Sequence, residues 1–303
     1  MRILVLGAGG IGGYYGGRLA QAGVDVTFLV RPRRAEQLAH DGLVVKGPVV
    51  EFAIPVTTVT RETIGPGYDA ILLSCKAYDL EDAIEAIRPA APGALILPLL
   101  NGIRHLERLD SAFGQAVTGG VAQISITLEP DGTIRHLAPM QGFIFGPRNP
   151  TQEAACSALA PVLDKGGFAP KLSPVIMQDM WEKFVFLCTL AATTCLMRGT
   201  VGAIARTDHG TSVALDMLAE CTAVATAAGY PPREGHAAFS RKMVTDRDSG
   251  TAASMLRDLQ RGGKVEAEHI IGDMLTRALA AGSPAPMLRA AYTHLQVYQA
   301  GLA

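Results

Sequence analysis

The chain has 303 residues, of which 49% are hydrophobic, and 27 Lys and Arg residues nearly balance 28 Asp and Glu residues at a net charge of -1. This length predicts about two domains, and the apolar fraction allows packed cores, which excludes a mainly disordered chain. The near-neutral charge and the single Trp argue against the basic face and the aromatic platform that nucleic-acid binding uses. We therefore expect no nucleic-acid partner.

The cysteines and the apolar runs indicate where the protein works. The five cysteines form no C-x-x-C pair and stand in or beside apolar runs, which favours free thiols in a reducing compartment over disulfides or a zinc site. The N-terminus lacks the pattern of a secretory signal. The longest apolar stretch, Phe184–Met197, is shorter than the roughly 20 residues of a membrane span. We expect a soluble cytoplasmic protein with no metal and no membrane partner.

Short apolar runs alternate with helical patterns in the first half of the chain. Four runs are typical of strands buried on both faces of a parallel sheet: Ile3–Leu6, Val24–Val30, Ala70–Ser74 and Ala94–Leu99. Helical stretches such as Gly12–Ala22 and Leu80–Ile87 lie between them. The alternation predicts βαβ units and a Rossmann-like, doubly wound α/β domain.

The pattern changes twice in the rest of the chain. The segments Val117–Thr127, Gly132–Leu137 and Gly142–Phe145 are typical of hairpin strands, which we expect to extend the parallel sheet. After Pro174 a helical periodicity runs through the stretches 177–197, 212–228, 253–260, 266–281 and 287–301. We predict a nucleotide-binding α/β domain over residues 1–174 and an all-helical substrate domain over residues 175–303, with a cleft between them.

A glycine-rich loop directly follows the first predicted strand. Gly7, Gly9 and Gly12 fit the G-x-G-x-x-G pattern, with Gly10 and Ile11 between them, and the loop opens a predicted helix. In dinucleotide-binding folds the glycines allow a tight turn, a close approach to the pyrophosphate and close helix packing, while the helix N-terminus attracts the phosphates. A glycine-rich turn without a ligand is the alternative.

The residue after the second strand indicates the type of dinucleotide. NAD-binding folds place an acidic residue there to bind the ribose 2′-hydroxyl, whereas this chain has Arg31. A guanidinium suits a 2′-phosphate through paired charge-assisted hydrogen bonds, so we predict NADP as the cofactor. An ordinary solvated basic loop would give the same sequence.

Polar residues at strand ends and on one apolar helix are the candidates for chemistry. Lys76 and Asn101 follow two predicted strands, at the sheet edge where open α/β folds bind ligands. Lys183 precedes an almost wholly apolar stretch, where a lysine either extends to solvent or is held in a polar pocket. A desolvated lysine beside a carboxylate such as Glu266 can donate a proton to a developing alkoxide, although periodicity alone does not bring the two together.

These residues together resemble the ketopantoate reductase family over nearly the whole chain. The matching segments are G-A-G-G-I-G-G-Y-Y-G at 7–16, C-K-A-Y-D at 75–79, N-G at 101–102, W-E-K at 181–183 and S-M-L-R-D-L at 254–259, followed by Glu266. The resemblance implies a two-domain enzyme that reduces the ketone of 2-dehydropantoate with NADPH, giving pantoate for pantothenate synthesis.

The same resemblance implies roles for individual residues. Lys183 matches the general acid of the family, and Glu266 matches its partner carboxylate. Ser254 matches a serine that helps to hold the substrate carboxylate, while Lys76 and Asn101 match residues that line the cleft from the nucleotide domain, next to cofactor and substrate. The arginine after the second strand matches the one associated with the 2′-phosphate.

Three positions depart from the family pattern. Leu187 and Ala191, four and eight residues after Lys183 and on its helical face, replace asparagines, and Ile271 replaces a third in E-A-E-H-I-I-G. Loss of amides that bind polar groups can cost large factors in discrimination between substrates. An apolar wall formed by Leu187, Ala191 and Met180 would favour a less hydroxylated 2-oxo acid.

We therefore predict an NADPH-dependent 2-oxo acid reductase that acts on 2-dehydropantoate or a related, less polar 2-oxo acid. The alternatives are another two-domain hydroxy acid dehydrogenase and a dinucleotide-binding sensor without turnover. The presence of Lys183 together with Glu266 argues against the sensor. The apolar helical domain is also compatible with a homodimer.

Overall fold

The computed structural model describes residues 1–302, which form two compact units. Unit 1 consists of Met1–Leu100 and His105–Asp179, and unit 2 consists of Asn101–Arg104 and the chain from Met180 on. The fold class is confirmed, because a Rossmann-like α/β unit is followed by a helical one. The boundary between the two units lies after Asp179, a few residues beyond the predicted boundary at residue 174. In addition, Asn101–Arg104, which the prediction assigned to the α/β domain, belong to the helical unit.

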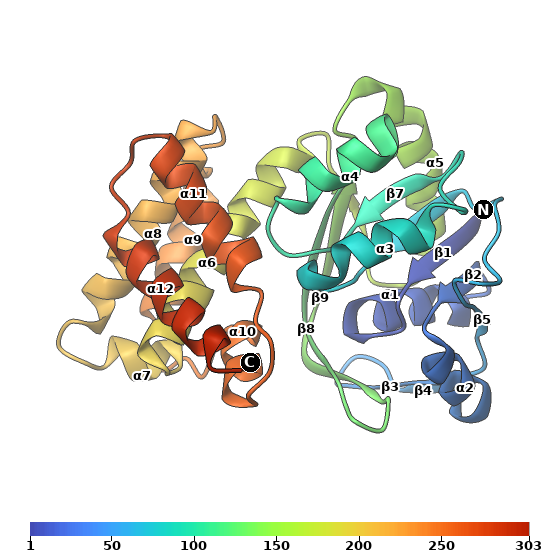
Figure 1. The fold of residues 1–303 in the computed structure, drawn as a ribbon, viewed down its shortest axis with the longest axis horizontal. Coiled ribbons are helices and arrows are strands. Elements are labelled where there is room, and N and C mark those ends of the chain that lie inside the picture. The colour runs from blue at the N-terminus through green and yellow to red at the C-terminus, as the bar shows by residue number, and fades with distance from the viewer. Residues whose placement is uncertain (303) are drawn as a thin grey trace. The chain divides into compact units, whose positions relative to one another are not determined.

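Unit 1 contains the predicted parallel sheet, with the strand order β5-β2-β1-β6-β7 within residues 1–302 (Figure 1). Its strands are β1 Arg2–Leu6, β2 Asp25–Leu29, β5 Thr57–Val59, β6 Ala70–Leu73 and β7 Leu95–Pro98. All neighbouring strands in it are parallel. Because β1 lies between β2 and β6, the loop that follows β1 is at the centre of the carboxyl edge of the sheet.

The helices of unit 1 are α1 Gly10–Gln21, α2 Pro32–Asp41, α3 Leu80–Ile87, α4 His105–Phe113 and α5 Glu153–Asp164. Helix α1 packs closely on both sheets of the unit. A Cβ on Gly16 would lie 2.9 Å from Phe28 and Val5 of the parallel sheet, and a Cβ on Gly13 would clash with Ile134 of the second sheet. The absence of side chains at Gly13 and Gly16 therefore lets α1 pack closely on both sheets.

The second sheet corrects the expected extension of the first. Strands β8 Gly119–Leu128 and β9 Ile134–Gly146 form a long antiparallel hairpin, drawn in green in Figure 1. Strand β9 also pairs with β3 Leu43–Lys46 and β10 Lys171–Leu172, and β3 pairs with β4 Phe52–Ile54. The expectation of two separate strands at 132–137 and 142–145 is wrong, because β9 is continuous across a register shift opposite Ile124 and Ile126.

Unit 2 is helical, and Figure 1 shows its part from Met180 on in yellow to red. Its helices are α6 Ile176–Met197, which begins in unit 1, α7 Val201–Ala205, α8 Gly210–Ala227, α9 Glu234–Thr245, α10 Ser254–Gln260, α11 Asp273–Ala280 and α12 Pro286–Ala300. The predicted helix 266–281 contains a π-helical turn, Glu268–Gly272, before α11. Such turns interrupt an α-helix locally and are frequent at functional sites.

Helix α6 is longer than its apolar sequence suggested. By length and composition it could cross a membrane, which corrects the expectation of a stretch too short to do so. However, 72% of its most apolar window is buried inside the protein. A helix that is apolar on nearly all sides and covered by neighbouring helices is typical of a protein core.

Candidate active site

The glycine loop after β1 has the geometry that a dinucleotide phosphate requires. Gly7 has a φ of +87°, which favours glycine. A Cβ on Gly12 would lie 2.3 Å from Ser74 Oγ and 2.4 Å from the Gly7 carbonyl oxygen, so only glycine lets α1 approach β1 this closely. By contrast, apart from Gly9 itself and its two chain neighbours, no heavy atom of the described residues lies within 4 Å of a Cβ built on Gly9. The loop thus leaves space at the N-terminus of α1, where phosphates bind.

Arg34 on α2 holds this loop from the side. Its Nη2 donates to the carbonyl oxygen of Ala8 at 3.0 Å and to that of Gly132, in the β8–β9 turn, at 3.1 Å. Burial lowers the pKa of the Arg34 guanidinium. Sequence reasoning did not single out Arg34. The only indication was the segment R-P-R-R at 31–34, in which the sequence does not show which of the three arginines contacts the glycine loop.

Arg31 and Lys76 both stand at the carboxyl edge of the parallel sheet. Arg31 precedes α2, and its guanidinium lies 3.5 Å from the carboxylate of Asp79. Lys76 is exposed and precedes a single 3₁₀ turn, Ala77–Asp79, which follows β6. The two cations therefore come from the strands on either side of the glycine loop.

Lys183 lies in a cluster of polar side chains within unit 2. Its Nζ donates to Asn101 Oδ1 at 3.1 Å. Burial lowers the pKa of Lys183 to about 8, and the Glu266 carboxylate opposes this shift. Glu266 is only 8% exposed. The structure thus brings together three predicted residues from distant parts of the sequence, and Asn101 does so as part of unit 2.

The segment that carries Asn101 is fixed to unit 2 on both sides. Gly102 has a φ of +76°, and a Cβ there would lie 3.3 Å from the carbonyl oxygen of His269. Arg104 forms a 2.8 Å ion pair with Glu268, which also accepts a hydrogen bond from the Tyr292 hydroxyl. These contacts hold the amide of Asn101 where Lys183 can reach it.

His269 is a member of this group that sequence reasoning missed. It lies in the π-helical turn and is 8% exposed. Burial lowers the pKa of its imidazole, while the carboxylates of Glu266 and Asp273 and the backbone of Asn101 oppose that shift. The only signal in the sequence was one histidine inside the apolar run that follows Glu266.

Glu182 faces away from this group, as the angle of about 100° between adjacent helical residues predicts. Its carboxylate accepts hydrogen bonds from the backbone N–H and from Nε of Arg233, both at 2.8 Å, at the start of α9. Glu182 therefore anchors a helix, whereas Lys183 remains with Asn101.

The positions that depart from the family pattern are not equivalent in the structure. Ala191 is 1% exposed and Ile271 is 0% exposed, so both belong to the core, and so does Met180. The expected apolar wall is therefore wrong for Ala191 and Met180, since both are packed under neighbouring side chains. Leu187 alone of these positions is partly exposed, one turn after Lys183.

Ser254 opens α10, which is fixed to α6 about three turns after Lys183. The backbone N–H of Ala253 donates to Thr194 Oγ1 at 3.4 Å, and the Thr194 hydroxyl donates to the carbonyl of Leu190 at 2.7 Å. Thr194 lies on the same helical face as Lys183. Its hydroxyl is thus committed to backbone partners and does not replace the asparagines.

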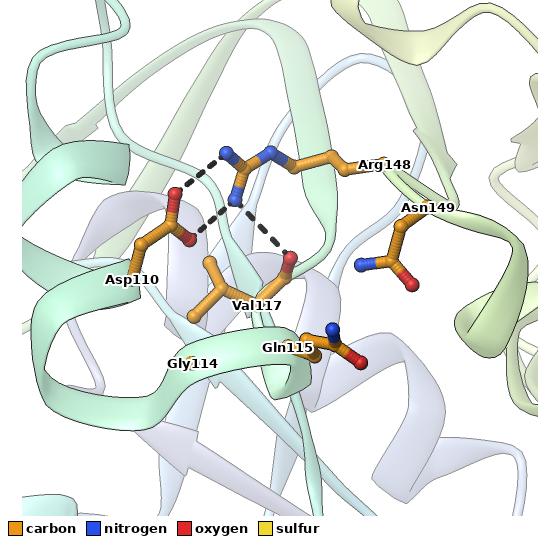
Figure 2. Close-up of a pocket in the computed structure, with 6 residues that line it drawn as sticks. All are labelled: Asp110, Gly114, Gln115, Val117, Arg148 and Asn149. Atoms are coloured by element: carbon orange, nitrogen blue, oxygen red, sulfur yellow. Dashed lines mark hydrogen bonds and ion pairs between the residues drawn. The ribbon is translucent and has the colours of Figure 1, made fainter.

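Two pockets of the described chain lie apart from these residues. The first, of about 260 Å³ in unit 1, is lined by Asp110, Gly114, Gln115, Val117, Arg148 and Asn149. Figure 2 shows the Arg148 guanidinium bound to both carboxylate oxygens of Asp110, at 2.6 and 2.7 Å, so its charge is neutralised. The second, of about 550 Å³, lies between α8 and α9 and is mostly apolar. Neither lining includes a residue predicted from the sequence for binding or catalysis.

Comparison with known proteins covers both units. The family model described as Ketopantoate reductase PanE/ApbA matches residues 3–150, and its C-terminal counterpart matches residues 175–299. The uncharacterized oxidoreductase YkpB of Bacillus subtilis (strain 168) is 34% identical over 99% of both chains. The 2-dehydropantoate 2-reductase of Pyrococcus abyssi is 27% identical over 95% of this chain and 94% of its own.

A solved structure agrees with the sequence matches. The PanE/ApbA family ketopantoate reductase from Ralstonia eutropha JMP134 superposes with a TM-score of 0.90 at 26% identity, covering 100% of this chain and 99% of the other. The two matched regions together span more than half of the chain. The chain therefore belongs to the ketopantoate reductase PanE/ApbA family of oxidoreductases.

Proposed function

We propose that this protein is an NADPH-dependent reductase of a 2-oxo acid, with Lys183 as the general acid. The observation that carries the proposal is the 3.1 Å hydrogen bond from Lys183 Nζ to Asn101 Oδ1, in a group that also contains the buried Glu266. A partly buried lysine with a lowered pKa is suited to donate a proton near neutral pH. Family membership supports the same chemistry.

The roles of the residues follow from the proton balance of a ketone reduction. NADPH, when bound, supplies the hydride that adds to the carbonyl carbon of the substrate. Lys183 Nζ–H donates its proton to the carbonyl oxygen, which becomes the hydroxyl of the 2-hydroxy acid, and Lys183 regains a proton from solvent. The Asn101 amide and the Glu266 carboxylate orient the ammonium and favour its charged form.

Other predicted residues would bind the two ligands. Gly7, Gly9, Gly10, Ile11 and Gly12 form the loop and first turn of α1 that would hold the pyrophosphate, with space next to Gly9. The exposed guanidinium of the arginine after β2 would bind the 2′-phosphate.

We propose that one cationic side chain and one hydroxyl group bind the substrate carboxylate. Lys76 supplies positive charge at the carboxyl edge of the sheet, and Ser254 supplies a hydroxyl at the start of α10. Binding and orientation of the reacting groups contribute much of the rate in such reactions.

The substrate that we favour is 2-dehydropantoate, reduced to pantoate for pantothenate synthesis. The relatives named 2-dehydropantoate 2-reductase support it. A related, less polar 2-oxo acid is the second candidate, because the partly exposed Leu187 stands where the family pattern has an amide. We further propose a cytoplasmic enzyme, consistent with five free thiols in the described chain, which acts on a small molecule, without nucleic acid or membrane, and is compatible with a homodimer.

Oxidation of NADPH in the presence of a panel of 2-oxo acids tests this function. We expect turnover with 2-dehydropantoate or with a less hydroxylated analogue, together with formation of the matching 2-hydroxy acid. A two-domain dehydrogenase of another kind would oxidise or reduce only substrates outside this panel. Binding of NADPH without turnover of any 2-oxo acid would support a sensor instead.

A further inference from the structure

Two opposite charges meet over the carboxyl edge of the parallel sheet. Arg31 follows β2, and Asp79 ends the 3₁₀ turn that follows β6. Strands β2 and β6 flank β1, so the two residues come from the loops on either side of the glycine loop. Arg31 Nη2 lies 3.5 Å from Asp79 Oδ1. The guanidinium assigned to the 2′-phosphate therefore already has an anionic partner.

The pair is accessible and weak enough to open. The side chain of Arg31 is 76% exposed, and that of Asp79 is 41% exposed. Ion pairs between solvent-exposed groups stabilise proteins only slightly, so a ligand can displace Asp79 at small cost. After displacement the carboxylate still lies close to whatever anion the guanidinium binds, because both residues follow strands that flank β1 and end at the same edge of the sheet.

We propose that Asp79 is a specificity-determining residue for the coenzyme, one that disfavours the 2′-phosphate and so narrows the preference for NADPH over NADH. The inference rests on the proposed function. A 2′-phosphate must compete with Asp79 for Arg31 and then lie near a like charge, which is unfavourable. The 2′-hydroxyl of NADH meets neither penalty and can donate a hydrogen bond to the carboxylate, as acidic residues near this site do in NAD-binding folds.

The variant Asp79→Asn removes the charge at nearly constant shape. We expect it to lower the Kd for NADPH about tenfold at low salt, while the Kd for NADH stays the same or rises, because only the phosphate gains from loss of the like charge. High salt should reduce the difference in NADPH affinity between Asp79→Asn and the unaltered protein, since exposed charges are screened. In an Arg31→Ala background the effect of Asp79→Asn should shrink, because the competition for the guanidinium is gone.

A matched control lies three residues further along the chain. Asp82, in the first turn of α3, is 59% exposed and pairs with Arg61 at 2.9 Å. Asp82→Asn therefore removes the same charge from a similar exposed ion pair that does not involve Arg31. We expect it to change the NADPH to NADH affinity ratio less than twofold.

Isothermal titration of the whole protein and its variants with NADPH, NADH, 2′,5′-ADP and 5′-ADP tests the inference without turnover. We expect Asp79→Asn to tighten NADPH and 2′,5′-ADP selectively. An unchanged ratio, or an equal change in Asp82→Asn, would overturn the role of Asp79 while the proposed function stands. If the unaltered protein binds neither dinucleotide, the proposed function fails, and the inference fails with it.

Discussion

At the scale of single residues, Lys183 combines properties that rarely occur together on an apolar helix. Its ammonium has a hydrogen-bond acceptor at 3.1 Å and a carboxylate nearby, yet burial lowers the pKa of Lys183 to about 8. At neutral pH such a lysine is still mostly protonated, and it gives up its proton more readily than an exposed lysine does. Both properties suit proton donation to a ketone oxygen.

Replacement of Lys183 by alanine should therefore separate chemistry from coenzyme binding. We expect kcat to fall by at least about 10²-fold in Lys183→Ala, because a general acid acts mainly in the transition state. The Kd for NADPH should stay within about twofold, since the glycine loop belongs to unit 1. Steady-state kinetics and calorimetry measure the two effects, and Lys242→Ala on α9 serves as a control. Normal turnover in Lys183→Ala would contradict the mechanism.

The pH profile of reduction should also report on Lys183. The protonated lysine is the active form, so kcat/KM should decrease as the pH rises through about 8. The Glu266 carboxylate raises the pKa of Lys183, and Glu266→Gln removes that effect. The decreasing limb of the profile should then move to lower pH. A limb that stays in place, or moves to higher pH, would show that Glu266 does not act on the titrating group.

At the scale of secondary structure, the elements with a continuous apolar pattern could be predicted and the others could not. Strands β1, β2, β6 and β7 are buried along nearly their whole length, and their runs of branched residues showed it. Helix α9 is largely polar and has few buried residues, so its sequence has no clear apolar stripe. The π-helical turn Glu268–Gly272 interrupts the predicted helix 266–281, and apolar periodicity does not indicate such an interruption.

The glycines of the α1 loop offer a prediction about packing and binding. A Cβ on Gly12 would clash with Ser74 Oγ, so Gly12→Ala should destabilise the protein by about 1–3 kcal/mol, as overpacking usually does. A Cβ on Gly9 has room among the described residues, so Gly9→Ala should cost no more than about 1 kcal/mol. It should nevertheless weaken NADPH binding at least tenfold, because the methyl occupies the space that the pyrophosphate needs.

Chemical denaturation and calorimetry together check this pair of glycine variants. Equal loss of stability in both variants would mean that the loop rearranges, and the close-packing argument would then be incorrect. Unchanged NADPH affinity in Gly9→Ala would place the pyrophosphate elsewhere.

At the scale of the whole molecule, the division into units could be predicted only in outline. The change from alternating to helical periodicity indicated two parts, but not that residues 101–104 join the helical one. That placement depends on contacts between residues more than 80 positions apart, such as Lys183 with Asn101 and Arg104 with Glu268. Local patterns contain no record of such contacts, and the family resemblance assigned Asn101 to the nucleotide domain, whereas the structure places it in unit 2.

The identity of the substrate is a question for the whole molecule. Family membership favours 2-dehydropantoate, whereas Leu187 favours a less polar 2-oxo acid, so a variant at Leu187 can distinguish the two. Relatives named 2-dehydropantoate 2-reductase act on a hydroxylated 2-oxo acid, but Leu187 offers no side-chain hydrogen bond one turn after Lys183. A hydroxyl desolvated without a partner costs roughly 1–3 kcal/mol, or about one to two orders of magnitude in kcat/KM. Leu187→Asn should therefore raise kcat/KM for 2-dehydropantoate at least tenfold relative to its analogue without the 4-hydroxyl.

Ala191→Asn is the matched control for this variant, because it adds the second of the three family amides at a position that is 1% exposed. Its larger polar side chain must enter the core, so we expect a lower melting temperature and no gain in selectivity for the hydroxylated substrate. The ratio of kcat/KM for the two substrates is the measurement in both variants. If the unaltered enzyme already prefers 2-dehydropantoate by tenfold or more, groups other than these asparagines bind the hydroxyl. The enzyme would then be an ordinary ketopantoate reductase with an altered α6.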